Sequence, residues 1–266
     1  MLSFPNAKIN LGLNIVSKRA DGYHNLESCF YPIPWNDVLE IIPSSELKFT
    51  STGLEIPGNI ESNLCVKAYQ LLVDSYAIKP VHIHLHKVIP MGAGLGGGSA
   101  DGAFTLSMLN EIFELKLSVS KLEELAGQLG SDCPFFIKNK PVYATGTGTT
   151  FESVNLNLAG KYLALKNPGI HVGTKEAYAG ITPKPSSKAI PDIIHSEIGL
   201  WKNQLHNDFE DSIFPNHPEI AQIKTDLYHK GALYASMTGS GSTVYGVFDE
   251  CPQISTDYKI IRLFHG

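Results

Sequence analysis

Alternating apolar and polar positions predict a strand near the start of the chain. In residues 8–15 the apolar positions are Ile9, Leu11, Leu13 and Ile15. This period of two is typical of a strand that turns one face to a core. The other face carries Lys8 and Asn10 as neighbours. That face is either a solvated edge or the wall of a site, and the strand alone leaves both open.

Further short apolar runs predict more strands. Residues 36–52 hold two extended runs separated at Pro43, which we expect to extend the same sheet. Val81, Ile83 and Leu85 alternate with three histidines, which predicts another half-buried strand. The histidines are His82, His84 and His86. Because no carboxylate lies near them in the sequence, a partly solvated strand face is favoured over a metal site.

Apolar residues spaced by four predict helices. Asn63 is placed to cap a helix that buries Leu64, Ala68 and Leu72. A second stripe begins near Ser99 and consists of Ala100, Phe104, Met108 and Ile112. Ser120 and Glu123 form a capping box for a third helix over 121–129, which Gly130 ends.

The glycine-rich stretch 90–101 lies between the strand at 81–89 and the helix that starts near Ser99. Glycines allow close approach of the backbone to an anion and take positive φ. The free N–H groups and the dipole of the helix start favour phosphate. The order strand, glycine loop and helix therefore predicts a phosphate-binding loop, with a ligand-free glycine turn as the alternative.

Two common glycine motifs overlap this loop without fitting it. Gly92, Gly94 and Gly97 satisfy the dinucleotide spacing, but a helix occupies the region where a second strand ending in an acid is required. The Walker spacing is also present, yet Gly98 stands where that motif has lysine. If the loop binds ATP, a lysine from elsewhere in the chain must assist.

The rest of the chain offers further polar candidates. Asp132 lies between the end of a helix and Pro134, which suits either catalysis or a turn. A new series of strands and helices begins after about residue 150, where Thr174 is a plausible cap for a helix that carries Tyr178. Residues 181–194 favour a mobile loop. Asp208 and Asp211 are expected near a helix start, and residues 235–242 form a second glycine loop before a strand.

Composition narrows the class of protein. The chain has 266 residues, of which 43% are hydrophobic and 18% charged, which suits a soluble protein of two lobes. The amino terminus lacks signal-peptide features, so we expect a bacterial cytoplasmic protein. Cys29, Cys65, Cys133 and Cys251 have no metal or disulfide spacing and are expected to be reduced. A net charge of -5 argues against nucleic-acid binding.

Taken together, these stretches resemble the GHMP kinases, a family of ATP-dependent kinases of small molecules. Residues 90–101 are similar to the family's glycine loop, and 238–241 to its carboxy-terminal glycine motif. Residues 5–13, 19–26, 130–136 and 207–210 resemble the branch whose substrate is an alcohol linked to cytidine diphosphate. Ala93 and Gly173 are small departures from the family pattern.

The resemblance implies an α+β, two-lobed GHMP kinase fold. It implies an amino-terminal ATP-binding domain in 1–150 and a ferredoxin-like carboxy-terminal domain in 151–266. ATP would be the phosphoryl donor, with Mg²⁺ as cofactor and Ser99 as a possible ligand to that ion. Its partners would be a small cytidine substrate but neither nucleic acid nor membrane, and the chain would be a monomer or a weak homodimer.

The resemblance also implies the residues of the site. Lys8 and Asp132 would be catalytic, with Asp132 as base toward the substrate hydroxyl and Lys8 keeping it ionised. ATP would be bound by Pro90, Met91, Gly92, Ala93, Gly94, Leu95, Gly96, Gly97, Gly98, Ser99 and Ala100. Substrate would be bound by Asn10, Tyr23, His24, Thr174 and Tyr178. The alternatives are another GHMP kinase, such as homoserine or mevalonate kinase, a nucleotide-binding regulator without catalysis, and a nicotinamide oxidoreductase.

Overall fold

The computed structural model describes residues 1–186 and 188–264 and divides the chain into two compact units. The first unit contains Met1–Ala7, Trp35–Met91 and Gly96–Lys140. The second contains Lys8–Pro34, Gly92–Leu95 and the chain from Pro141 on. The units are therefore interleaved along the sequence. The lobe boundary expected near residue 150 stays a prediction.

The first unit is built on a mixed sheet with strand order β1-β4-β6-β5. Its strands are β1 (Leu2–Ser3), β4 (Val38–Pro43), β5 (Lys48–Gly53) and β6 (Val81–Lys87). β5 runs parallel to β6, whereas β4 runs antiparallel to it. Val81, Ile83 and Leu85 are buried, which confirms the alternation that predicted this strand. The expectation that residues 36–52 extend the sheet of residues 8–15 is wrong, because β4 and β5 pair with β6.

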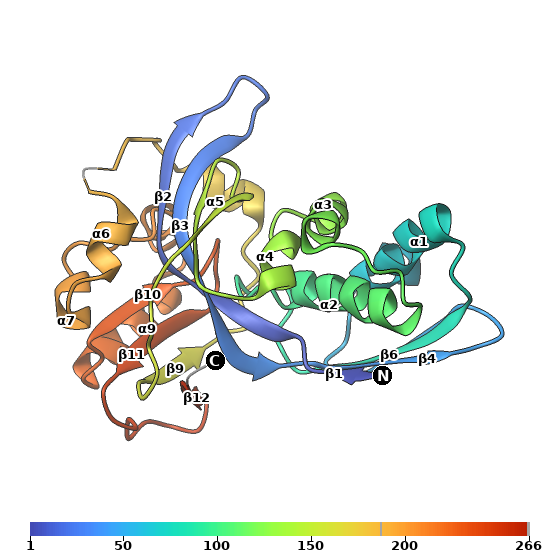
Figure 1. Ribbon diagram of the computed structural model, residues 1–266. Helices are drawn as coiled ribbons and strands as arrows, with labels where there is room; N and C mark the ends of the chain where they lie inside the picture. The colour runs from blue at the N-terminus through green and yellow to red at the C-terminus, as the bar shows by residue number, and fades with distance from the viewer. Residues whose placement is uncertain (187, 265–266) are drawn as a thin grey trace. The chain divides into compact units, whose positions relative to one another are not determined.

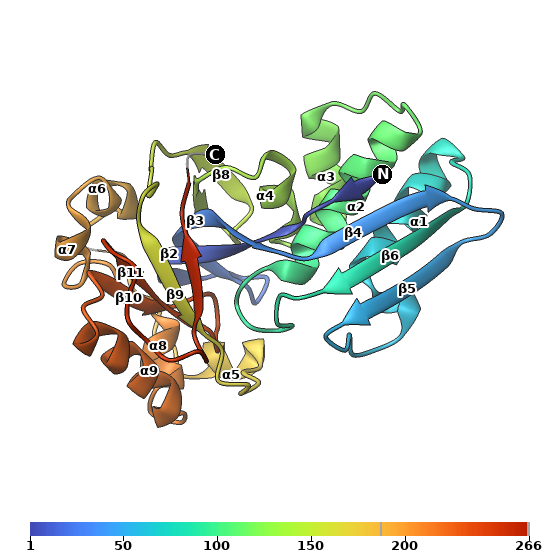
Figure 2. The same cartoon turned by 90° about the horizontal axis from the view of Figure 1, so that it is seen from below.

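Helices cover one face of this sheet (Figures 1 and 2). They are η1 (Ile60–Ser62), α1 (Leu64–Tyr76), α2 (Gly97–Ile112), α3 (Val119–Leu129) and α4 (Cys133–Lys138). Asn63 caps α1 by accepting a hydrogen bond from Cys65 N, as predicted. The predicted cap of α3 is wrong by two residues, because Ser118 rather than Ser120 accepts from Lys121 N.

The three histidines of β6 are tied to the neighbouring strand rather than arranged around an ion. The Thr50 hydroxyl lies 2.8 Å from both His82 Nε2 and His84 Nδ1. The Thr52 hydroxyl lies 3.1 Å from His84 Nε2 and 2.9 Å from His86 Nδ1. These contacts confirm a partly solvated polar face, which the parallel register of β5 and β6 lines up.

A second sheet, with strand order β2-β3-β7-β8, carries the opening strand of the prediction. Its strands are β2 (Asn6–Lys18), β3 (His24–Asn36), β7 (Val142–Thr145) and β8 (Thr150–Ser153). Lys8 and Asn10 are only 3% and 2% exposed, so both faces of β2 are buried at this point. The solvated-edge interpretation is therefore wrong, and these polar residues belong to an interior network.

The carboxy-terminal sheet is antiparallel, with strand order β10-β11-β9-β12. Its strands are β9 (Tyr162–Lys166), β10 (Tyr234–Met237), β11 (Val244–Phe248) and β12 (Lys259–Arg262). α5 (Thr174–Ala179), α6 (Ile190–Ile194), α7 (Ile198–Trp201), α8 (Phe209–Ile213) and α9 (Pro218–His229) connect β9 to β10. α9 packs on β10 and β11 (Figure 2). Its buried residues Ile220, Ile223 and Leu227 join the core of this sheet.

Three expectations in this region need correction. Residues 190–194 form α6 and bury Ile190, Ile193 and Ile194, so the end of the predicted mobile loop is ordered; residue 187 lies outside the described residues. Residues 235–237 belong to β10, so the second glycine loop is shorter than predicted. The Asp208 carboxylate accepts from Ile15 N at 2.7 Å instead of simply facing a helix dipole.

Two predictions from composition can be compared with the structure. All four cysteines are free thiols, as expected. Among the described residues, no helix is both long enough and apolar enough to span a membrane. The mixture of antiparallel and mixed sheets with helices confirms the α+β class.

Candidate functional site: a glycine loop and its surroundings

The predicted phosphate-binding loop connects β6 to α2. Gly92, Gly94 and Gly96 have φ values of 61°, 76° and 70°, in the left-handed region that favours glycine. Gly96 is the N-cap of α2, so the first turn of a 16-residue helix follows the loop directly. The unpaired N–H groups of such a turn attract anions. The loop therefore has the backbone of an anion-binding site.

Gly94 is required because the second glycine loop lies against it. A Cβ on Gly94 would be 2.0 Å from the carbonyl oxygen of Thr238. The Thr238 hydroxyl lies 3.1 Å from the Gly94 carbonyl oxygen, to which it donates. The two loops, far apart in the sequence, thus meet backbone to backbone within the second unit.

Lys8 and Asn10 form a buried network beside these loops. Lys8 Nζ donates to Asn10 Oδ1 at 2.5 Å and lies 5.0 Å from the centroid of the Phe30 ring. Asn10 Oδ1 also accepts from Gly239 N at 3.0 Å, and Asn10 Nδ2 donates to Ser28 Oγ at 2.8 Å. Asn10 therefore links the lysine to the second glycine loop.

Asp132 lies in the first unit, where α4 packs against α2. Asp132 is the N-cap residue of α4, but its side chain does not accept the capping hydrogen bond, so helix capping does not account for it. The next residue, Cys133, has a thiol close enough to the Ser99 side chain for Ser99 to lower its pKa slightly. Burial raises the pKa of this thiol to about 11, so it stays neutral near pH 7. Ser99 therefore lies near the segment that carries Asp132.

The two predicted catalytic residues belong to different units. Lys8 is part of the second unit and Asp132 is part of the first. The glycine loop itself is shared, since 92–95 belong to the second unit and 96–100 to the first. The pairing of Lys8 with Asp132 stays a prediction.

The structure brings together two of the predicted substrate residues. The rings of His24 and Tyr178 are stacked, with centroids 4.7 Å apart and an interplanar angle of 20°. The Tyr178 ring also packs nearly perpendicular to the Phe209 ring, with centroids 4.9 Å apart and an interplanar angle of 84°. Tyr23 is 68% exposed, and its N–H donates to the Asp21 carboxylate in the preceding turn at 3.1 Å.

Thr174 differs from its predicted role as a helix cap. It is the first residue of α5, and Gly173 is the N-cap residue. α5 is held instead by Ser212, which donates its hydroxyl to Ala177 O at 2.7 Å. A role of Thr174 in substrate binding stays a prediction.

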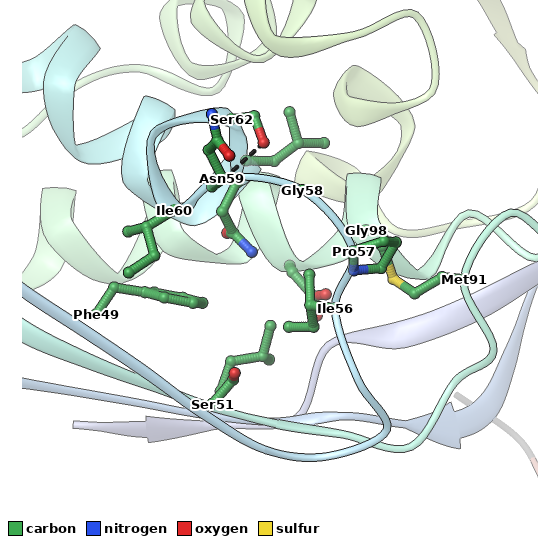
Figure 3. Close-up of a pocket in the computed structure, with 14 residues that line it drawn as sticks. Phe49, Ser51, Ile56, Pro57, Gly58, Asn59, Ile60, Ser62, Met91 and Gly98 are labelled. Atoms are coloured by element: carbon green, nitrogen blue, oxygen red, sulfur yellow. Dashed lines mark hydrogen bonds between the residues drawn. The ribbon is translucent and has the colours of Figure 1, made fainter.

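Sequence reasoning missed a cavity of about 220 Å³ in the first unit (Figure 3). It lies at the beginning of α2, where Met91 and Gly98 line it. Apolar side chains, main-chain groups and amides form its remaining walls, from Phe49, Ser51, Ile56, Pro57, Gly58, Asn59, Ile60, Ser62, Asn63, Leu64, Leu85 and Asp101. The only sequence signal was the run of Pro57, Gly58 and Asn59 after a strand, which is typical of any loop.

A buried cluster of charged side chains, Lys87, Asp37 and Asp101, adjoins this cavity through Asp101. Lys87 Nζ donates to Asp37 Oδ2 at 2.5 Å and to Asp101 Oδ2 at 2.6 Å, with all three side chains at most 4% exposed. Asp37 Oδ1 accepts from Val88 N and Ile89 N. Burial, with Asp37 in addition, raises the pKa of Asp101 to about 7 although Lys87 opposes this shift. The cluster fixes the end of β6 from which the glycine loop starts.

Known proteins resemble this chain in sequence and in fold. The GHMP kinases N terminal domain matches residues 63–140, and the GHMP kinases C terminal domain matches 189–254. A relative from Cytophaga hutchinsonii, 4-diphosphocytidyl-2-C-methyl-D-erythritol kinase, is 56% identical over 254 residues, 95% of this chain and 94% of its own. The chain belongs to the GHMP kinase family. Its two-lobed GHMP kinase fold is thereby confirmed.

Solved structures agree with this assignment. A crystal structure of 4-(cytidine 5'-diphospho)-2C-methyl-D-erythritol kinase matches this GHMP kinase with a TM-score of 0.81 and 30% identity, covering 93% of this chain and 90% of that one. The mevalonate kinase of Methanococcus jannaschii matches with a TM-score of 0.70 at 16% identity, covering 93% of this chain and 90% of that one. The second match shows the shared fold alone.

Proposed function

We propose that this GHMP kinase transfers the γ-phosphoryl group of ATP to the 2-hydroxyl of 4-diphosphocytidyl-2-C-methyl-D-erythritol. The products are the 2-phosphate of this alcohol and ADP. The reaction belongs to the non-mevalonate, or methylerythritol phosphate, pathway of isoprenoid biosynthesis. Relatives named for this kinase, at 56% and 52% identity over 95% and 99% of the chain, support the assignment.

The stacked rings of His24 and Tyr178 are the observation that carries the choice of substrate. Aromatic rings bind a nucleobase by stacking, and a histidine ring adds hydrogen bonds that distinguish one base from another. The hairpin between β2 and β3 and the helix α5 each supply one of these rings. A cytidine group recognised there distinguishes this substrate from mevalonate and homoserine, which have no base.

Asp132 is proposed as the base that takes the proton of the attacking hydroxyl, as the family resemblance implies. Phosphoryl transfer needs an in-line hydroxyl and neutralisation of charge on the phosphates. The buried Lys8 is proposed to keep this carboxylate ionised and to stabilise charge on the transferred group. Backbone N–H groups of 94–99 are proposed to hold the β- and γ-phosphates.

The hydroxyl of Ser99 suits a Mg²⁺ ion bound with ATP. It is a hard oxygen donor, half-buried in the first turn of α2 and near Cys133. We propose that Ser99 is one of the ligands. When bound, Mg²⁺ supplies positive charge to the β- and γ-phosphates.

The cavity of the first unit is proposed to bind the adenine of ATP. Its apolar wall, which includes Phe49, Ile56 and Ile60, offers contact to a flat ring (Figure 3). Asn59 and Asn63 also line the cavity and offer amide groups. Met91 and Gly98 place the cavity beside the glycine loop. A base and its phosphates would thus occupy adjoining parts of one surface.

The remaining expectations are kept as proposals. ATP binding is assigned to 1–150 and the ferredoxin-like domain to 151–266, with substrate contacts from Asn10, Tyr23, His24, Thr174 and Tyr178. We place the protein in the bacterial cytoplasm, as a monomer or weak homodimer without nucleic-acid or membrane partners. The absence of a basic run in the sequence supports the last point.

Release of ADP from ATP with each candidate alcohol tests the proposal. The purified protein should release ADP with the diphosphocytidyl substrate and not with homoserine or mevalonate. Phosphorus NMR of the product should place the new phosphomonoester on the 2-position. Turnover with mevalonate or homoserine alone would identify another GHMP kinase, and ATP binding without turnover would favour a regulator.

A further inference from the structure

The segment Asn207–Glu210 resembles the family, yet the proposed function gives it no role. Its main chain is bonded to β2, because Leu13 N donates to His206 O and Asp208 N donates to Leu13 O, each at 2.8 Å. The Asp208 carboxylate also accepts a hydrogen bond from Ile15 N. The segment is thus fixed against β2, the edge strand of its sheet, where it enters α8.

Asn207 connects this fixed segment to the second glycine loop. It is fully buried, and its Nδ2 donates to Met237 O at 2.8 Å and to Gly239 O at 2.9 Å. Its Oδ1 accepts from Phe209 N at 3.1 Å, which starts α8. The two ends of this amide therefore have separable tasks, since the nitrogen holds the loop and the oxygen holds the helix.

Glu210, which lies in α8, accepts hydrogen bonds from the same loop. Its side chain is 2% exposed, and Oε1 accepts from Met237 N at 2.8 Å and from the Ser236 hydroxyl at 3.1 Å. Lys224 Nζ donates to Oε2 at 2.5 Å and balances the buried charge. Both main-chain polar groups of Met237 are therefore bonded to this segment.

The opposite side of the loop lies against Gly94. The Thr238 hydroxyl bonds to Gly94 O, and a Cβ on Gly239 would be 3.0 Å from Gly94 Cα. Gly94 has positive φ and would clash with Thr238 O if it carried a side chain. The position of residues 237–239 therefore restricts the conformation of Gly94.

We propose that Asn207 and Glu210 are positioning residues for nucleotide binding. They hold residues 237–239 against Gly94 and so fix the phosphate-binding loop in the conformation that accepts ATP. The inference rests on the proposed function, because it takes this loop as the ATP site. A preorganised loop loses less conformational entropy when it binds a ligand. Loss of the hydrogen bonds from Asn207 and Glu210 should therefore weaken ATP binding.

Asn207→Asp separates positioning from helix capping. Aspartate keeps an oxygen acceptor for Phe209 N but removes both donations to the loop and places oxygen against two carbonyl oxygens. We expect the Michaelis constant for ATP to rise roughly 5- to 100-fold, as for loss of two hydrogen bonds. The constant for the cytidine substrate should stay within about twofold. Asn216→Ala is the control, because the Asn216 side-chain amide donates to Ser212 O, which is not part of the glycine loop.

Direct binding of ADP, measured by titration calorimetry, completes the test. Equal affinity of the folded Asn207→Asp variant and the parent would overturn the inference and leave the proposed function intact. Absence of ADP binding by the parent would overturn both. A measurement on the parent alone remains decisive if the variant does not fold. ADP should slow amide hydrogen exchange at 237–241 as well as at 92–99. Unchanged exchange at 237–241 would contradict the proposed positioning role of Asn207 and Glu210.

Discussion

Burial decides the role of single polar residues here more than their type does. Lys8 and Asn10 have the sequence pattern of a solvated strand face, but each is almost completely buried and bonded to the other. A buried lysine needs partners, because an unpaired charge in the interior costs several kcal/mol, on the order of the whole stability of many domains. The alternation predicted which face each residue occupies. It gave no sign that the face that carries Lys8 is buried as well.

Asp132→Asn tests the proposed base. We expect turnover to fall by about 10² to 10⁴, the usual contribution of a positioned base, while ADP affinity stays near that of the parent. Asp74→Asn, on the exposed surface of α1, is the matched control and should change neither quantity. Turnover of Asp132→Asn close to that of the parent would show that Asp132 serves only the turn before α4.

Asp101 should make stability depend on pH in a direction unusual for a carboxylate. Its pKa is about 7 in the folded chain and about 3.9 when exposed. Between these values the folded chain holds a proton that the unfolded chain has lost. Its contribution to stability is therefore greatest below about pH 4 and falls as pH rises to about 7.

Asp101→Asn removes this proton equilibrium and keeps an acceptor for Lys87. The melting temperature of the variant, minus that of the parent, should increase between about pH 5 and about pH 9. Thermal denaturation followed by circular dichroism measures this difference. A difference that is flat or that decreases with pH would mean that Lys87 keeps Asp101 ionised in the folded chain.

At the scale of elements, the two glycine loops act as one structure. Gly94→Ala places a methyl group 2.0 Å from the Thr238 carbonyl oxygen and strains a residue with φ of 76°. We expect ATP affinity to fall about tenfold or more, because the loops must separate. Gly127→Ala, in α3 with its nearest neighbouring atom at 3.9 Å, is the control and should bind ATP normally. Titration calorimetry of both variants measures the effect, and unchanged affinity of Gly94→Ala would refute the contact as a requirement.

Local signals predicted most elements, and long-range packing explains the errors. The strand at 81–87 and the helices that begin after Asn63 and Gly96 follow from alternation, capping and spacing. α6 was missed because a proline- and serine-rich segment gives no local reason to bury Ile190, Ile193 and Ile194. The cavity was missed because its walls come from a strand, a loop and a helix start that only folding brings together.

The functional site also contains features with local sequence signals and features without them. The glycine loop and Asp132 were found from neighbours in sequence, since turns and helix ends have local signatures. The contacts of Asn207 and Glu210 with residues 236–239 have none, because the partners are distant in the chain. The resemblance to a family supplied the aromatic substrate residues, which periodicity alone does not distinguish from a core.

At the scale of the whole molecule, the chain crosses between the two units near residues 7, 34, 91, 95 and 140. Because several chain segments connect the two units, unfolding of one unit should disrupt the other. We therefore expect one cooperative transition. In Trp35→Phe the only remaining tryptophan is Trp201, buried in the second unit. α1, α2 and α3 lie in the first unit and contribute helical signal.

Tryptophan fluorescence and far-ultraviolet circular dichroism of the Trp35→Phe variant should therefore give the same denaturant midpoint. Both probes are read from one sample, so the comparison does not depend on the effect of the substitution itself. Separate midpoints would show that the units unfold independently, with the crossings acting only as tethers.

The stack of His24 on Tyr178 also sets a condition on the rate of substrate entry. Centroids 4.7 Å apart leave no space for a third ring, since carbon atoms of stacked rings approach to only about 3.5 Å and a sandwich needs roughly twice that. If cytosine lies between these rings, they must part before it enters. The observed association rate should then level off with rising substrate concentration, at the rate at which the ring pair opens. Cytosine stacking on the outer face would instead give a rate that rises linearly.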